Sequence, residues 1–522
     1  MFGRRTAISF FIMSTLFLSC ILRITIICSK DYSTVYANQN YYNLKISNLR
    51  GTVFDRNMIP ITNNIKKYVA AVTPTPRAIT AISSVLKGDE LMEVLNELKK
   101  GKPVVCDVPE KINCDGIFST EIFVSDRNTA KHTIGYCNND GMGVMGIEKA
   151  YEDVLNQNKD IYLQYECDGK GNILEGVYPT LNYNTKILAD GVKTTIDINL
   201  QNIAEEYANY IEKGAIVIAE AKSGKIRACV SRPDINLNNI NNSLENENSP
   251  FVDRSINAYS VGSVFKPCVA IAGIENKKNN FLYECTGSCE IIDRVFKCHN
   301  REGHGTIDLK NAVAQSCNTF FYNFSFNVGE ENIYKTASNL LFGRSIKLCN
   351  GIKTATGTLP KSDTLKNRAQ LANFSIGQGE LTLSPISILT LYCSIANEGV
   401  YNIPSLTEGI IKKGQLIKNA STSPTRVMSK RTSDIIKEYL KEVLISGTGI
   451  DATPQKTTAA GKTATAQTGK FDNGTEICSG WFCGFFPFEN PEYVVVVFSE
   501  DTRKQTKTCS QIFSEIADRI IN

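Results

Sequence analysis

A serine and a lysine three residues apart are the side chains best suited to chemistry. They lie in Tyr259-Ser-Val-Gly-Ser-Val-Phe-Lys-Pro267. If this segment is helical, Ser263 and Lys266 share one face. Gly262 provides a turn into the helix, and Pro267 fits a first turn, where the missing N–H costs little. A lysine partly removed from water can accept a serine proton as a neutral amine. The alternative is a helix-capping serine beside a solvated lysine, which the pair alone does not exclude.

A second polar motif, Ser316-Cys317-Asn318, stands between two predicted helices. Residues 306–316 have apolar residues at helical spacing, and another helix is expected from Phe320 onward. A polar triplet at such a junction brings a hydroxyl and a carboxamide into one corner.

A third motif lies in Ala459-Ala-Gly-Lys-Thr-Ala-Thr-Ala-Gln467, which we expect to be a strand because of its β-branched threonines. With a two-residue period, Lys462 and Ala464 face one side of the strand, and Thr463 and Thr465 face the other.

The elements around these motifs predict an α+β domain. An amphipathic helix is expected after Asp197, followed by strands at 215–221 and 226–231. Strands near Trp481 and at 493–498 and a final helix with Ile512, Ile516 and Ile520 would complete an antiparallel sheet flanked by helices.

The N-terminal half contains no set of side chains from which we can assemble a catalytic site. The stretch Asn48–Asn57 suggests a short strand entering a loop, with a surface hairpin and ion pair as the alternative. Residues 78–100 have helical spacing, and 103–125 suggest short strands. This part is expected to be a scaffold.

The chain begins with a candidate membrane anchor. Residues 6–22 are uncharged and mostly apolar, and after Arg23 the run resumes to Cys28, about the length that spans a bilayer. Arg4 and Arg5 in front favour a cytoplasmic N-terminus. A cleaved signal peptide is the alternative, but no small-x-small site closes the run.

Composition limits the remaining options. The 522 residues suggest about two or three folded units, and the net charge of +4 is small and scattered, which gives no support for a nucleic-acid partner. Only three histidines occur, which argues against a Ser-His-Asp triad.

The cysteines are numerous for an exported protein. Of 17, two lie in the predicted anchor, which leaves an odd number outside it. Cys285, Cys289, Cys298, His299 and His304 are close in sequence, but their spacing is irregular for zinc. We expect no metal site, and a disulfide between Cys285 and Cys298 instead.

In chain order, Ser263-x-x-Lys266, Ser316-x-Asn318 and Lys462-Thr-Ala-Thr465 resemble the motifs of the penicillin-recognising serine acyltransferases. The strings Ile376-Gly-Gln-Gly379 and Arg50-Gly-x-x-x-Asp55-Arg56, together with Gly146-Ile-Glu148 and the anchor, make the chain similar to a class B penicillin-binding protein.

This resemblance implies a role for each motif residue. Ser263 would be acylated by the D-Ala-D-Ala end of a peptidoglycan stem peptide, with Lys266 as base. Ser316 and Lys462 would relay a proton to the leaving amine, and Asn318 would hold the substrate amide. The residues expected to border the substrate are Gly262, Thr463, Ala464 and Thr465.

The family usually has glycine where this chain has Ala464. The extra methyl group could crowd the segment that carries Ser263, or small neighbours could absorb it. We expect this methyl group to affect the affinity for substrate and β-lactam more than the reaction itself.

The resemblance also implies the architecture. We expect an anchor in residues 1–30, a non-catalytic α+β pedestal in 31–190, and in 191–522 a transpeptidase domain with a five-stranded antiparallel sheet, flanking helices and an all-helical subdomain. The catalytic part would be extracytoplasmic, with no cofactor. Stem peptides and β-lactams would be ligands, a polytopic membrane glycan polymerase would be a partner, and a homodimer is conceivable.

Two other functions stay open. One is a hydrolase of the same chemistry, a D,D-carboxypeptidase or β-lactamase, in which water replaces the acceptor amine. The other is a catalytically inert β-lactam sensor or scaffold subunit. The long pedestal favours a transpeptidase, because simple hydrolases do not need one.

Overall fold

The computed structural model describes residues 2–29, 41–125, 128–138, 140–156, 159–168, 170–174, 176–182, 190–237 and 239–521. Contacts divide the chain into two compact units. The first consists of residues 1–49, 66–123 and 158–185, and the second of 50–65, 124–157 and 186–522. Most of the predicted polar stretch after the anchor, residues 31–40, lies outside the described residues.

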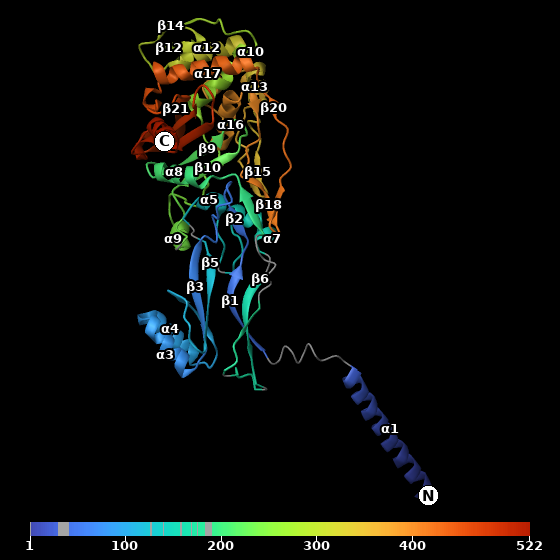
Figure 1. The fold of residues 1–522 in the computed structure, drawn as a ribbon. Coiled ribbons are helices and arrows are strands. Elements are labelled where there is room, and N and C mark those ends of the chain that lie inside the picture. Colours follow the sequence, from blue (N-terminus) through green and yellow to red (C-terminus); the bar gives the residue numbers. More distant parts are fainter. Residues whose placement is uncertain are drawn as a thin grey trace. The chain divides into compact units, whose positions relative to one another are not determined.

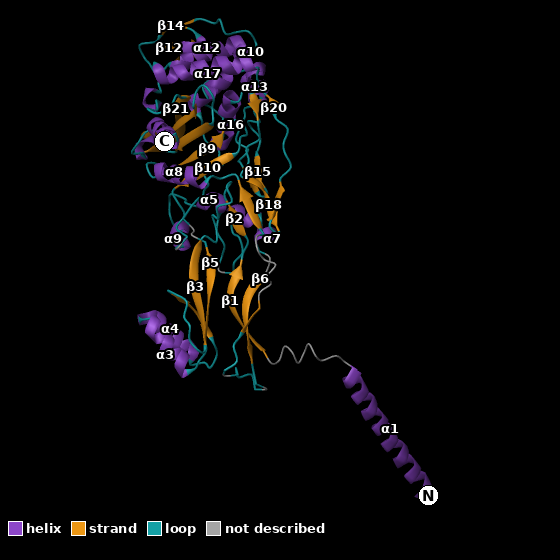
Figure 2. Ribbon diagram, in the orientation of Figure 1, coloured by secondary structure: helices purple, strands orange, loops and turns teal. Residues whose placement is uncertain are grey.

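The first unit contains the N-terminal helix α1 (Phe2–Ser29), of which Thr6–Ser29 is long and apolar enough to cross a membrane. It also contains two three-stranded sheets, shown in Figures 1 and 2. Their orders are β1-β6-β7 (Tyr41–Leu49, Lys159–Glu166, Thr180–Asn182) and β4-β3-β5 (Val104–Val108, Ile65–Val72, Ile117–Val124). Apolar side chains from both sheets form one small core.

A second small core of this unit lies under two helices. The predicted helix over 78–100 is instead α3 (Pro76–Val85) and α4 (Gly88–Leu98). The break has a local cause, because Leu86 and Lys87 are extended and Gly88 has a φ of +61°, a conformation that glycine adopts without strain.

The second unit is built on a five-stranded antiparallel sheet of order β10-β9-β23-β22-β21, as predicted. The strands are β9 (Gly214–Glu220), β10 (Ile226–Arg232), β21 (Ala460–Asp472), β22 (Thr475–Phe486) and β23 (Tyr493–Ser499). The central strand β23 is almost wholly buried, which explains its unbroken run of valines.

Helices cover the sheet and form a further layer (Figure 1). Helix α16 (Pro385–Ala396) packs on β9, β22 and β23, and every one of its residues is buried, which suits its apolar sequence. Helices α8 (Ile198–Ala208) and α18 (Cys509–Ile520) contact each other and the sheet. The subdomain predicted to be all-helical contains α10 (Lys266–Glu275), α11 (Leu309–Ala314), α12 (Asn318–Val328), α13 (Glu330–Asn339) and α17 (Lys430–Ile445). It is not all-helical, because the short strand pairs β11–β14 (Tyr283–Cys285 with Gly305–Ile307) and β12–β13 (Ser288–Ile291 with Arg294–Lys297) lie between α10 and α11 in the chain, and β11 and β13 contact α12.

The segment Asn48–Asn57 contains strand β2 (Thr52–Phe54), which pairs in parallel with β8 (Gly191–Thr194). Arg50 in this segment donates to the Glu148 carboxylate at 2.5 Å and to Glu152 at 2.6 Å. These contacts join the two N-terminal strings that accompany the class B resemblance.

Candidate active site

Ser263 lies in the 3₁₀ turn η2 (Gly262–Phe265), which leads directly into α10. The Lys266 backbone N–H donates to the Ser263 carbonyl, closing this turn. Gly262 has a φ of +60°, as its predicted role in a turn requires, and Pro267 lies in the first turn of α10. Ser263 is half-buried, and its hydroxyl has no hydrogen-bond partner among the described residues.

The turn that carries Ser263 is fixed from several sides. The Gly262 N–H donates to the Gly377 carbonyl at 2.9 Å, and a Cβ on Gly377 would lie 2.1 Å from the Gly262 oxygen. The Trp481 indole donates to the Ser260 carbonyl at 3.1 Å. The Tyr392 hydroxyl donates to the Val264 carbonyl at 3.0 Å. The Gly-Gln-Gly string therefore supports the serine turn by close backbone contact.

The Lys266 amine is fully buried and meets the Ser316-x-Asn318 motif. Its Nζ donates to the Ser316 carbonyl at 2.6 Å, to the Asn318 Oδ1 at 2.7 Å and to the Ser316 Oγ at 3.1 Å. Burial lowers the pKa of Lys266 to about 7, while the neighbouring Cys317 and Cys298 oppose this shift. A substantial share of this lysine is therefore neutral near pH 7.

The corner that receives Lys266 is conformationally unusual. Ser316 has a φ of +54°, which costs a non-glycine residue on the order of 1–3 kcal/mol. Asn318 begins α12, and the Cys317 side chain caps that helix by accepting from the Phe320 N–H. The predicted helix before the corner is α11, which starts only at Leu309 after its cap Asp308.

Strand β21 carries the third motif. Lys462 is fully buried, and its Nζ donates to the Thr448 Oγ1 and the Thr463 carbonyl, both at 3.3 Å. Burial, followed by repulsion from Lys266, holds the pKa of Lys462 well below its usual value.

The other residues of β21 alternate as predicted. Ala464 is buried like Lys462, whereas Thr463 is half-buried and Thr465 is exposed. A Cβ built on Gly262 would lie 3.5 Å from the Ala464 Cβ and 3.0 Å from the Ala466 Cβ. The Ala464 methyl group thus faces a glycine, which leaves it room.

Thr448 is a site residue that the sequence prediction missed. Its hydroxyl lies 2.8 Å from the Thr463 Oγ1 as well as accepting from Lys462. It follows α17 in the sequence Ser446-Gly-Thr-Gly449. This glycine-rich turn was the only available signal, and turns of this kind are common.

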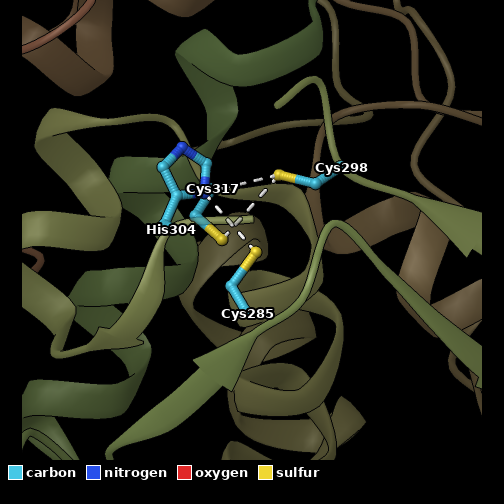
Figure 3. Close-up of side chains that lie close together, drawn as sticks. All are labelled: Cys285, Cys298, His304 and Cys317. Carbon is cyan, nitrogen blue, oxygen red and sulfur yellow. Dashed lines mark hydrogen bonds between the residues drawn. The ribbon is translucent and has the colours of Figure 1, made fainter. Parts of the chain in front are cut away.

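The predicted disulfide between Cys285 and Cys298 is wrong, since both are free thiols. The Cys285 Sγ instead accepts from the Thr319 hydroxyl at 3.0 Å and lies 3.5 Å from the His304 Nδ1. Tertiary contacts bring Cys317, distant in sequence, into the same cluster (Figure 3).

A five-stranded antiparallel sheet, a helical layer and a Ser-x-x-Lys turn are typical of serine acyltransferases. Residues 214–521 match the family model described as the penicillin binding protein transpeptidase domain. The chain belongs to this family, which confirms the predicted fold and its class as a penicillin-binding serine transpeptidase.

Curated proteins support this assignment over most of the chain. The chain is similar to stage V sporulation protein D of Bacillus subtilis, with 26% identity over 87% of this chain and 74% of that protein. It is also similar to the peptidoglycan D,D-transpeptidase MrdA of Haemophilus influenzae, with 23% identity over 74% of this chain and 64% of that protein.

Solved structures share the fold over nearly the full length. Penicillin-binding protein 3 of Mycobacterium tuberculosis, complexed with aztreonam, covers 92% of this chain and 96% of its own, with a TM-score of 0.64 and 18% identity. The penicillin-binding protein PBP2 of Helicobacter pylori, in complex with MreC, covers 92% of this chain and 98% of its own, with a TM-score of 0.67 and 20% identity.

Proposed function

We propose that this chain is a membrane-anchored peptidoglycan D,D-transpeptidase that works through an acyl-enzyme on Ser263. The observation that carries the proposal is the Lys266 amine, which is fully buried and held by Ser316 and Asn318 close to the serine turn. Two short contacts to oxygens that only accept use two N–H bonds of a neutral amine. The Ser316 hydroxyl, 3.1 Å away, then lies on the lone pair of the amine, which would take the Ser263 proton by giving up this longer contact.

The reaction begins when the Ser263 Oγ attacks the carbonyl carbon between the two terminal D-alanines of a stem peptide. The hydroxyl proton passes to the Lys266 Nζ as the new C–O bond forms. The C–N bond then breaks, and a proton relayed through Ser316 and Lys462 reaches the nitrogen of the departing D-alanine. Asn318 holds the amide of the donor peptide.

The other motif residues would stabilise negative charge on the substrate. The backbone N–H groups of Ser263 and Thr465 would stabilise the oxyanion, each worth about 3 kcal/mol in the transition state. Lys462, Thr463 and Thr465 would bind the terminal carboxylate, and Gly262 and Ala464 would border the substrate. An amine of a second stem peptide then attacks the ester, forms the cross-link and returns the proton to Ser263.

A β-lactam would acylate the same serine, because its strained amide imitates the D-Ala-D-Ala end. Intact-mass spectrometry after incubation with benzylpenicillin tests this. We expect one penicilloyl adduct on the wild-type chain and none on Ser263→Ala. A retained adduct on the variant would refute the nucleophile.

The hydrolase alternative predicts a different lifetime for the same adduct. In a transpeptidase, water hydrolyses the penicilloyl-Ser263 ester slowly, because the enzyme transfers acyl groups to amines. Loss of this ester within seconds would identify a β-lactamase or carboxypeptidase. The inert-sensor alternative predicts that Ser263→Ala keeps its role in cells, whereas a transpeptidase variant fails to complement.

For the rest of the chain, we propose a cytoplasmic N-terminus and functional regions at 1–30, 31–190 and 191–522, although residues 50–65 and 124–157 of the second region pack within the same compact unit as the third. The apolar helix Thr6–Ser29 behind Arg4 and Arg5 supports this orientation.

By the class B resemblance, the anchor and pedestal would contact a polytopic glycan polymerase. Co-purification of that polymerase with the full chain, but not with a chain carrying a foreign anchor and pedestal, is the test. Size-exclusion chromatography would show whether a homodimer forms instead.

A further inference from the structure

Four potential ligand atoms converge beside the active-site corner. They are the Sγ atoms of Cys285, Cys298 and Cys317 and a ring nitrogen of His304, and all lie within 4.8 Å of one another (Figure 3). The His304 Nδ1 is 3.5 Å from the Cys285 Sγ and 3.7 Å from the Cys298 Sγ. The Cys298 and Cys317 sulfurs are 3.9 Å apart.

The separations of 3.5, 3.7 and 3.9 Å are close to the edges of a tetrahedron around a metal ion, and the other pairs lie within 4.8 Å, so a bound ion would draw the four atoms together by about 1 Å at most. With Zn–S of about 2.3 Å and Zn–N of about 2.0 Å, tetrahedral edges are roughly 3.8 Å between two sulfurs and roughly 3.5 Å between sulfur and nitrogen. A disulfide would require about 2.05 Å between sulfurs. The cluster is therefore too open for a disulfide and has the right size for one zinc ion.

The cluster is also enclosed, as structural zinc sites are. The three cysteines are buried and His304 is half-buried. The surrounding groups orient the sulfurs, because the Thr319 hydroxyl donates to the Cys285 Sγ and the Phe320 N–H donates to the Cys317 Sγ. Outer contacts of this kind are typical of metal-binding cysteines.

The local fold gives a reason for a metal. Cys285 ends β11 (Tyr283–Cys285), Cys298 follows β13 (Arg294–Lys297), and His304 precedes β14 (Gly305–Ile307). Strands of three or four residues bury little apolar surface, so they need another link to stay in place. The described part of this region has no disulfide to provide one.

We infer that Cys285, Cys298, His304 and Cys317 bind one structural Zn²⁺ ion. Three thiolates and one imidazole are soft and borderline ligands that favour zinc over magnesium or calcium. Four protein ligands complete the coordination, so the ion holds structure and does not activate water. The prediction of no metal site, based on irregular spacing, failed to consider Cys317.

Cys317 links the ion to the reaction, a step that depends on the proposed function. It stands between Ser316 and Asn318, whose oxygen atoms hold the Lys266 amine. Ser316 has a left-handed backbone conformation that the surrounding structure must hold. A zinc bond to the Cys317 Sγ fixes this corner, so the metal acts as a positioning element for Lys266.

Metal content of the full chain in detergent tests the site directly. After dialysis without chelator, elemental mass spectrometry should find one zinc per chain, and cobalt substitution should give the visible absorption of a tetrahedral cobalt thiolate. Cys298→Ser should lose both. Cys289→Ser is the matched control, because Cys289 is a nearby half-buried cysteine outside the cluster, and it should keep both. Less than a tenth of an equivalent of zinc in the wild-type chain, with no cobalt spectrum, would overturn the site.

The link to catalysis needs no variant that might misfold. Removing zinc from the wild-type chain with a chelator should slow penicillin acylation at least tenfold, and added Zn²⁺ should restore it. Bound zinc whose removal leaves acylation unchanged would overturn the positioning role. A chain that holds one zinc but never forms the adduct would overturn the proposed function and leave the metal site standing. A chain that is purified without zinc and still acylates rapidly would overturn the metal site and leave the proposed function standing.

Discussion

Two lysines, Lys266 and Lys462, are fully buried in the same unit but are held in different ways. Lys266 has three oxygen partners at 2.6–3.1 Å. Among the described residues, the Lys462 amine has two contacts, both at 3.3 Å, to Thr448 and Thr463. Buried amines are costly unless their hydrogen bonds are made. The protein therefore holds the Lys266 amine with short contacts and the Lys462 amine with two long ones, a difference that fits the proposed role of Lys462 in contacting the substrate.

The largest expected effect comes from removing the fixed amine. Lys266→Met should slow acylation by benzylpenicillin about 10²–10⁴-fold, the usual contribution of a general base. Lys266→Arg should be equally slow, because an arginine keeps the charge but cannot accept a proton at neutral pH. Stopped-flow or quenched intact-mass kinetics measure both. A fast Lys266→Arg variant would show that only charge matters at this position.

Removing the second amine should be less severe and should depend on the ligand. Lys462→Met should slow acylation roughly 10-fold to 100-fold, because a hydrogen bond to a charged group is worth about 1.5–3 kcal/mol. The wild type should prefer benzylpenicillin over its methyl ester, and the variant should lose this preference. An unchanged preference would mean that Lys462 does not bind the carboxylate.

Thr448, which contacts both Lys462 and Thr463 of β21, should matter less than Lys462 itself. Thr448→Val removes the hydrogen bonds to Lys462 and Thr463, and the loss of the one that holds the Lys462 amine, worth about 1 kcal/mol, should slow acylation about fivefold. Thr422, an exposed threonine in a loop, is the control, and Thr422→Val should have the wild-type rate. Equal rates for both variants would place Thr448 outside the site.

The smallest effect is expected at Ala464. Because its methyl group faces Gly262, Ala464→Gly should change acylation by no more than about threefold. It should lower the free energy of unfolding by roughly 0.5–1 kcal/mol, the cost of glycine inside a strand. Chemical denaturation and acylation kinetics check the two effects. A tenfold faster variant would show that the methyl group does crowd the serine turn.

Much of this architecture could be predicted from local sequence. The valine run of β23 and the glycine turn before Ser263 each have one favoured structure, so the sheet and the nucleophile segment were predicted. The roles of Ser263, Lys266, Ser316, Asn318 and Lys462 came from a resemblance and remain predictions.

What could not be predicted depends on tertiary contacts. Cys317 joins Cys285, Cys298 and His304 only because α12 begins beside two short strand pairs, and no spacing rule connects them. Thr448 approaches Lys462 across a turn with no distinctive pattern. The division of 78–100 into two helices follows from the extended Leu86 and Lys87 and the positive φ of Gly88, a local backbone conformation that the helical spacing of apolar residues does not reveal.

The pH dependence of acylation tests the neutral Lys266 most directly. Since only the neutral amine can take the serine proton, and its pKa is lowered to about 7, the rate of benzylpenicillin acylation should fall about tenfold per pH unit below 7 and level off above it. An exposed lysine would keep the rate rising to about pH 10. A rate that rises through pH 8 and 9 without levelling off, or that does not change with pH, would contradict the assignment of Lys266 as a buried, neutral base.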